Sequence, residues 1–245
     1  MNGFPADAGR LAIRQPSRGY RFSIDSVLLA GFAAPLARGA VLDLGTGCGV
    51  LLLLLCRISP SPFSGIGVEL QEELFALAGE NFRDNRLASR LLAVRGDLRG
   101  EIPGVVAGAF DLVVSNPPYG VAGRGRRNPD PCRETARHEV SCSLPELFAA
   151  AGRYAAAGGR FAVILPFSRL PEIEACVRRE GMTGECFRRV HPREGAPPSR
   201  ILYCAAPGRG GATRELPPLY LHGEHEKYVP EVERICRLFR GGRGS

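Results

Sequence analysis

The feature that most constrains the fold of this chain is a glycine-rich turn between two apolar segments. Residues 41–44 form a short apolar run that carries Asp43, and the turn G-T-G-C-G follows directly at residues 45–49. Residues 50–55 are then apolar without a break, and this run is too short to span a membrane. A strand, a glycine turn and a buried helix in this order predict the first unit of a doubly wound α/β sheet. Ligands of such sheets bind at the carboxyl ends of the strands.

The turn and two later acidic residues indicate the kind of ligand. The pattern D-x-G-x-G-x-G differs from a dinucleotide fingerprint because Val50 takes the place of the third glycine. Glycines let the backbone approach a ligand with no Cβ between them. Glu69 ends the next predicted strand, where its carboxylate can accept from both hydroxyls of a ribose. Asp97 ends the third, where it can accept from the exocyclic amine of an adenine.

A second motif ends the fourth apolar run, residues 110–115, with the sequence Asn116-Pro117-Pro118-Tyr119. Two consecutive prolines remove two backbone donors and fix φ at both positions, so the turn is stiff and its carbonyls point outward. Such a turn, with an amide acceptor and an aromatic ring, can hold a flat, amino-bearing group by hydrogen bonds while the ring stacks on its face. We take these four residues as the candidate catalytic turn.

In this order, the glycine turn, the two strand-end acids and the N-P-P-Y turn resemble the class I S-adenosylmethionine-dependent methyltransferases. The resemblance implies a Rossmann-like α/β fold with a seven-stranded, mostly parallel sheet and helices on both faces. It also implies S-adenosyl-L-methionine as the cofactor. The glycine turn would take its methionine part, Glu69 its ribose and Asp97 its adenine. No metal is expected.

The rest of the chain predicts one structural domain with additions at both ends. Residues 1–40 form an N-terminal extension whose helix starts after Ser23 and packs on the core. Residues 41–206 form the S-adenosylmethionine-binding domain, and residues 207–245 form a tail with a short helix.

Other local signals place the later elements. Ser143 and Glu146 have the spacing of a capping box, and the helix that they open is expected to stop at Gly158-Gly159. An antiparallel hairpin of residues 186–190 and 201–205 is expected to complete the seven strands.

The composition of 44% hydrophobic and 23% charged residues is typical of a globular protein. The formal charge of +7 favours an anionic partner. Eight cysteines show neither a C-x-x-C pair nor zinc-like spacing with the histidines, so free thiols in a reducing cytoplasm are expected. The first ten residues lack the apolar core of a signal peptide, so we expect a cytoplasmic protein with no membrane association.

Methyltransferases with N-P-P-Y modify a planar nitrogen, so the resemblance leaves three acceptors: adenine N6, cytosine N4 or a glutamine amide. DNA enzymes with this motif carry a separate target-recognition domain, for which this chain has no stretch. Glutamine methyltransferases of release factors carry a sizeable helical domain before the glycine turn, whereas only 40 residues precede the predicted core here. The alternatives that remain are methylation of a glutamine amide in a protein such as a release factor, and methylation of an amino group in rRNA or DNA.

A third class of methyltransferase, one that acts on RNA, matches more of the chain. The segment from Gln15 through Gly19-Tyr20-Arg21-Phe22-Ser23-Ile24-Asp25 resembles the N-terminal signature of the bacterial tRNA(Val) adenine-N6 methyltransferase family. So do Arg127-Asn128-Pro129, Ala136-Arg137-His138-Glu139 and residues 226–231. The resemblance implies N6-methylation of the adenine beside the anticodon of tRNA(Val), with the anticodon loop as partner. The oligomeric state, monomer or homodimer, stays open.

The residue assignments follow from the motifs and these resemblances. The expected catalytic residues are Asn116, Pro117, Pro118 and Tyr119. The expected cofactor-binding residues are Arg21, Phe22, Asp25, Asp43, Gly45, Thr46, Gly47, Gly49, Glu69, Leu70, Asp97, Leu98 and Asn116. The expected RNA-binding residues, in the long irregular stretch 120–142, are Arg124, Arg126, Arg127, Arg137 and His138. The arginines would hold phosphates, and His138 would order the loop by pairing with Glu139 or Asp130.

Overall fold

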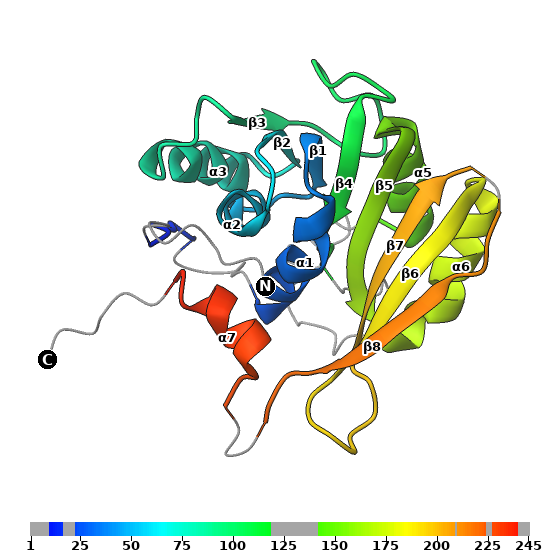
Figure 1. The fold of residues 1–245 in the computed structure, drawn as a ribbon. Helices are drawn as coiled ribbons and strands as arrows, with labels where there is room; N and C mark the ends of the chain where they lie inside the picture. The colour runs from blue at the N-terminus through cyan, green and yellow to red at the C-terminus, as the bar shows by residue number, and fades with distance from the viewer. Residues whose placement is uncertain (1–9, 17–22, 119–141, 209, 224–226, 240–245) are drawn as a thin grey trace, which may run out of the picture.

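The computed structural model describes residues 10–16, 23–118, 142–208, 210–223 and 227–239. They build an eight-stranded sheet of order β3-β2-β1-β4-β5-β7-β6-β8 (Figure 1). The strands are β1 Gly39–Leu44, β2 Phe63–Glu69, β3 Leu91–Arg95, β4 Phe110–Ser115, β5 Ala155–Pro166, β6 Met182–His191, β7 Arg200–Pro207 and β8 Arg214–Tyr220. Strands β1 to β5 pair in parallel, β7 runs antiparallel to both β5 and β6, and β8 is parallel to β6. The predicted α/β class and the predicted hairpin are confirmed.

The strand order reverses at β1, which pairs with β2 on one side and with β4 on the other. Asp43 of β1 lies beside Val114 of β4, so the glycine turn and the N-P-P-Y turn leave the sheet next to each other. This is the switch point at which open α/β sheets bind ligands.

Helices cover both faces of the sheet (Figure 1). They are α1 Ile24–Ala33, α2 Val50–Ile58, α3 Glu72–Asp84, α5 Leu144–Tyr154, α6 Leu170–Arg179 and α7 Pro230–Cys236, with short 3-10 turns at Ala34–Leu36 and Phe167–Arg169. Apolar residues of α1, α2, α3 and α7 share one hydrophobic cluster, and those of α5 and α6 share the other. Each face of the sheet therefore has its own core.

Helix α1 starts as its sequence predicts, because the Ser23 side chain accepts a hydrogen bond from the backbone N–H of Asp25. The burial is wider than the expected single stripe, and both Asp25 and Ser26 are buried. Helix α7 accounts for part of this burial because it packs against α1. A Cβ placed on Gly31 of α1 would lie 3.0 Å from the Ile235 side chain of α7. The tail of the chain thus packs against the N-terminal helix.

The N-terminal extension is also attached to α3. Asn81 is fully buried, accepts from the Arg14 N–H at 2.7 Å, and donates both to the Arg14 carbonyl at 2.9 Å and to the Cys48 carbonyl at 2.8 Å. One side chain therefore joins the extension to the glycine turn.

Two elements differ from the prediction. Helix α5 has the predicted capping box but ends at Tyr154, and β5 starts at once instead of after the two glycines. A Cβ on Gly159 would lie 2.5 Å from the Phe110 carbonyl oxygen, so this glycine allows close approach of two strands and does not end the helix.

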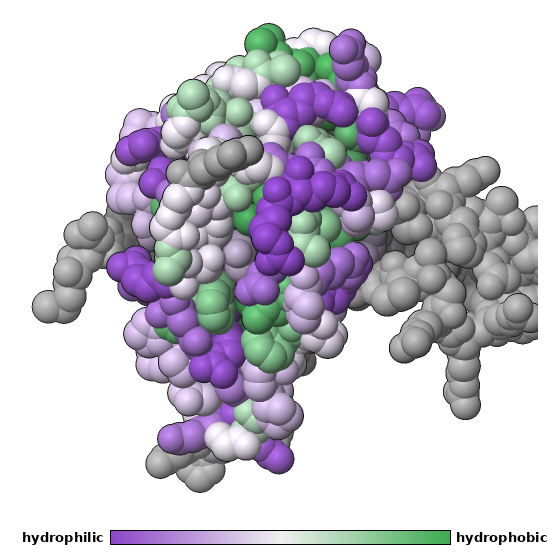
Figure 2. All heavy atoms as spheres, turned by 90° about the vertical axis from the view of Figure 1, so that its right-hand side faces the viewer, coloured by the Kyte–Doolittle hydropathy of each residue, from purple (hydrophilic) through white to green (hydrophobic). Residues whose placement is uncertain are grey.

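The other difference is the eighth strand, β8, in the predicted tail. It contains Pro217 and Pro218, which suit only an edge strand because proline cannot donate to a sheet ladder. It also carries the charged residues Arg214 and Glu215, and Glu215 pairs with Arg189 of β6. Figure 2 shows this end of the molecule, where hydrophilic side chains alternate with small apolar areas. Such charges hinder pairing with another sheet.

Candidate active site

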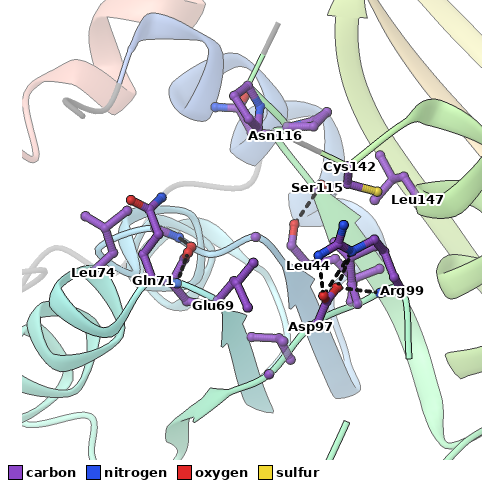
Figure 3. A pocket seen from close by; sticks show the side chains of 18 residues that line it. Leu44, Glu69, Gln71, Leu74, Asp97, Arg99, Ser115, Asn116, Cys142 and Leu147 are labelled. Atoms are coloured by element: carbon purple, nitrogen blue, oxygen red, sulfur yellow. Dashed lines mark hydrogen bonds and ion pairs between the residues drawn. The ribbon is translucent and has the colours of Figure 1, made fainter. Parts of the chain in front are cut away.

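The carboxyl ends of β1 to β4 surround a pocket (Figure 3). It is lined by Leu44, Gly45, Gly47, Val68, Glu69, Leu70, Gln71, Leu74, Gly96, Asp97, Leu98, Arg99, Ser115, Asn116, Pro117, Pro118, Cys142 and Leu147. The glycine turn, both strand-end acids and the start of the N-P-P-Y turn therefore meet at one site. Parallel strands bring these segments together because their carboxyl ends lie at the same edge.

The glycine turn forms one wall of the pocket. The backbone N–H groups of Gly45 and Thr46 both donate to the Val68 carbonyl, at 3.0 and 2.9 Å, which holds the turn against the end of β2. Gly45 has φ +75°, and a Cβ built on it would meet nothing within 4 Å. This position therefore leaves open space where a ligand can contact the backbone.

Asp43 and Thr46 lie behind this wall. The Thr46 hydroxyl donates to the Asp43 carboxylate at 2.7 Å, and Asp43 is only 1% exposed. Burial raises the pKa of Asp43 to about 7, against the lowering effect of the Thr46 hydrogen bond. Gly49 also lies behind, at the start of α2, where a Cβ would be 2.6 Å from the Phe82 ring. We infer that these three predicted cofactor residues support the turn.

Glu69 stands at the centre of the site and is 6% exposed. Its two carboxylate oxygens accept from the backbone N–H groups of Gly47 and Gln71, each at 2.9 Å. Burial raises the pKa of Glu69, although these backbone hydrogen bonds act in the opposite direction. Each carboxylate oxygen has a second lone pair, so the fixed carboxylate can still accept from ligand hydroxyls.

Asp97 lies across the pocket from Glu69 and is bound by Arg99 (Figure 3). The Arg99 backbone N–H donates to it at 2.9 Å, and the guanidinium Nη2 donates at 2.6 Å. The hydrogen bonds from Arg99 lower the pKa of Asp97, so this carboxylate is ionised at neutral pH. Arg99 is a pocket residue that the sequence motifs do not indicate.

Asn116, Pro117 and Pro118 line the rim beside the end of β4. The preceding residue, Ser115, is buried and its hydroxyl donates to the Leu44 carbonyl at 2.7 Å, which ties the two strand ends together. The Asn116 amide nitrogen donates to the Ser26 hydroxyl of α1 at 3.1 Å.

Of the remaining predicted residues, three lie within the described ranges and eight lie outside them. Leu70 and Leu98 line the pocket, whereas Asp25 is buried in α1 and pairs with Arg200 at 3.4 Å. The others lie outside the described residues: Arg21, Phe22, Tyr119, Arg124, Arg126, Arg127, Arg137 and His138. Their roles stay predictions.

The sequence motifs do not indicate several of the pocket residues. Gln71 and Ser115 are neighbours of predicted residues, so their positions along the chain signal them. Cys142 precedes α5 and Leu147 lies in its first turn, on a different part of the chain, and no local pattern connects them to the pocket.

The pocket suits an adenosyl ligand that carries an amino acid. Gly45 leaves room at the turn, Glu69 offers buried carboxylate oxygens, and Leu70 and Leu98 supply apolar walls for a flat ring. Within the described parts of the chain, no cluster of His, Cys, Asp and Glu could hold a metal ion. In those same ranges, no helix has the length and apolar character needed to cross a membrane.

Solved structures resemble this fold. A predicted O-methyltransferase from Agrobacterium tumefaciens matches with a TM-score of 0.67 at 22% identity, over 87% of this chain and 96% of that one. A type I restriction-modification methyltransferase subunit from Streptococcus thermophilus matches with a TM-score of 0.61 at 17% identity, over 89% of this chain and 52% of that one. At these identities the likeness concerns the fold.

Sequence comparison is more specific. The profile of the methyltransferase small domain matches residues 23–128. The tRNA1(Val) (adenine(37)-N6)-methyltransferase of Aeromonas salmonicida is 32% identical over 215 residues, which cover 88% of each chain. The protein of the same name from Tolumonas auensis is 28% identical over 98% of each chain. The chain therefore belongs to the tRNA1(Val) (adenine(37)-N6)-methyltransferase family.

Proposed function

We propose that this chain methylates the N6 amine of an adenine in tRNA, and that its target is the adenine beside the anticodon of tRNA(Val). Its methyl donor is S-adenosyl-L-methionine. The proposal rests on one observation: Asn116 stands at the rim of the cofactor pocket, in a chain that matches tRNA-methylating relatives along nearly its whole length.

S-adenosyl-L-methionine would supply an electrophilic methyl group on its sulfonium sulfur, and the neutral thioether S-adenosylhomocysteine would be a good leaving group. The pocket residues would hold the cofactor in place. Gly45, Gly47, Glu69 and Asp97 all line the pocket. The backbone at the two glycines would take the methionine part, Glu69 would accept from the ribose hydroxyls, and Asp97 would accept from the adenine amine. Rigid placement of both reactants accounts for much of the expected rate.

The acceptor amine needs activation because its lone pair is delocalised into the adenine ring. The Asn116 side-chain oxygen and the Pro117 carbonyl can each accept a hydrogen bond from one of the two N–H groups of this amine. These hydrogen bonds favour a pyramidal nitrogen whose lone pair points at the methyl group. Tyr119 would stack on the ring and set its angle. Methylation leaves the nitrogen as an acidic cation whose proton can pass to water, so a strong general base is not required.

The RNA would be held by the arginine-rich stretch that follows the N-P-P-Y turn, with Arg124, Arg126, Arg127 and Arg137 on phosphates. An adenine in an anticodon loop is single-stranded and is therefore easier to extract than a paired base. A tRNA substrate would place the reaction in the cytoplasm.

The test is methyl transfer from labelled S-adenosylmethionine to an unmodified tRNA(Val) transcript. Two transcripts serve as controls. In one, adenine 37, the position given in the names of the relatives, is replaced by guanine. The other is an unrelated tRNA. A release-factor protein is offered in parallel. Nucleosides are then identified by mass.

We expect N6-methyladenosine in the first transcript and none in the guanine variant. Label in both the original and the guanine-substituted tRNA(Val) transcripts would mean that the target is another adenine. Label in the protein and none in the RNA would contradict the proposal and favour glutamine methylation.

A further inference from the structure

A buried serine of the N-terminal helix contacts the candidate catalytic amide directly. The Asn116 Nδ2 donates to the Ser26 Oγ at 3.1 Å, across 90 residues of sequence, and Ser26 is 3% exposed. We infer that Ser26 is a positioning residue that orients the Asn116 amide for methyl transfer. The inference rests on the proposed function, because it concerns the amide that is proposed to bind the target amine.

The orientation matters because the two ends of an amide are chemically opposite. The oxygen only accepts hydrogen bonds and the nitrogen only donates them. The target amine presents two N–H donors, so a reversed Asn116 amide would set donor against donor. With Nδ2 directed to Ser26, the oxygen occupies the other branch of the amide plane. Figure 3 shows Asn116 at the rim of the pocket.

The backbone alone does not set this orientation. Asn116 precedes Pro117, which restricts its φ and ψ to extended values. Rotation about the terminal side-chain bond of asparagine is broad and roughly two-fold, so the backbone leaves both amide orientations open. A side-chain contact can restrict this rotation, and in this structure Nδ2 is the end of the amide that contacts Ser26, whose hydroxyl accepts from it.

Ser26 is itself held firmly, which makes it a suitable reference point. Its backbone N–H donates to the Ser23 carbonyl at 3.2 Å, in the capped first turn of α1. The neighbouring Asp25 is buried and pairs with Arg200 at 3.4 Å. Arg200 starts β7 and lies in register with Pro166, at the end of β5. The first turn of α1 is thus tied to the same edge of the sheet that carries Asn116.

The test compares two serine variants from the same helical turn. Ser26→Ala removes the contact with Asn116, whereas Ser23→Ala removes the helix cap and leaves that contact in place. Single-turnover methyl transfer is measured at saturating tRNA and cofactor, together with cofactor Kd by calorimetry and Tm. Ser26→Thr, which keeps the hydroxyl, is the conservative variant.

We expect Ser26→Ala to lower the single-turnover rate roughly tenfold with wild-type cofactor Kd, the effect of losing one hydrogen bond that matters in the transition state. Ser26→Thr should restore most of the rate. Ser23→Ala should lower Tm and reduce the rate less than Ser26→Ala does, because the Ser26 hydroxyl remains. In an Asn116→Ala background, Ser26→Ala should cause no further loss, because the two residues act through one contact.

The inference is overturned if Ser26→Ala has the wild-type rate, if Ser23→Ala lowers the rate equally, or if the Ser26→Ala loss persists in the Asn116→Ala background. Failure of the proposed function is a separate result. In that case the wild-type enzyme forms no N6-methyladenosine in tRNA, and both proposals are overturned together.

Discussion

Arg99 binds the carboxylate of Asp97 at the mouth of the pocket, through its backbone N–H and both Nε and Nη2 of its guanidinium. The carboxylate proposed to accept from the cofactor's adenine amine therefore already has a charged partner. Asp97 remains partly exposed, with 37% of its side chain accessible. If the adenine amine binds as proposed, it would compete with Arg99 for the lone pairs of this carboxylate.

Replacing Arg99 should relieve this competition. Exposed ion pairs contribute little, so we expect Arg99→Gln to tighten cofactor binding by no more than about threefold. Calorimetric titration with S-adenosylhomocysteine measures the change. A clear loss of affinity would instead mean that Arg99 itself contacts the cofactor.

Replacing Asp97 should weaken cofactor binding. Asp97→Ala removes a charged acceptor for the adenine amine, and we expect roughly tenfold weaker affinity by the same titration. Asp84→Ala is the matched control, because Asp84 also forms an exposed ion pair, with Arg14 at 2.7 Å, at the end of α3. Wild-type affinity in Asp97→Ala would refute its assignment.

The two glycines at positions 45 and 49 should separate binding from folding. A Cβ at Gly45 enters open space, so Gly45→Ala should cost about 1–2 kcal/mol of backbone strain and block the cofactor. A Cβ at Gly49 lies 2.6 Å from Phe82, so Gly49→Ala should destabilise the core more strongly. Thermal unfolding and calorimetry distinguish the two. Unimpaired cofactor binding by a folded Gly45→Ala variant would rule out the proposed contact at the turn.

The buried Asp43 should make stability depend on pH. Its pKa in the folded chain is about 7, whereas an unfolded aspartate titrates near pH 4. Between these values the folded chain binds the extra proton, so this group favours folding at low pH and its contribution falls as the pH rises from about 4 to about 7. Glu69, whose pKa is also raised, acts in the same direction.

Asp43→Asn cannot take up this proton. We therefore expect the difference in unfolding free energy between pH 5 and pH 8 to shrink in Asp43→Asn relative to wild type. Chemical denaturation at the two pH values measures it. An unchanged difference would show that Asp43 is ionised throughout this range.

Asn116 should matter far more for turnover than for cofactor binding. Asn116→Ala removes an acceptor of the target amine, so we expect methyl transfer to fall by about a hundredfold or more while the cofactor Kd stays within a few-fold of wild type. Single-turnover assays with tRNA measure the rate. Turnover near the wild-type level would eliminate the proposed catalytic role.

Much of the fold is predictable from the sequence because its signals are local. Ser23 caps α1 and Ser143 with Glu146 caps α5, as their spacing indicates. Helices follow the first, second and fourth of the first five strands, and this pattern predicts a parallel sheet. The edge strand β8 was missed because its prolines are typical of loops and its pairing with β6 is a long-range contact.

The site divides in the same way. Glu69, Asp97 and Asn116 each follow a recognisable strand, and parallel strands bring their carboxyl ends to one edge, so the sequence by itself determined that these side chains share a pocket. Only the tertiary structure decided which groups surround them. The contact of Asn116 with Ser26 and that of Asp25 with Arg200 join residues 90 and 175 positions apart. Such contacts depend on how helices pack on the sheet, and no periodicity along the chain encodes that packing.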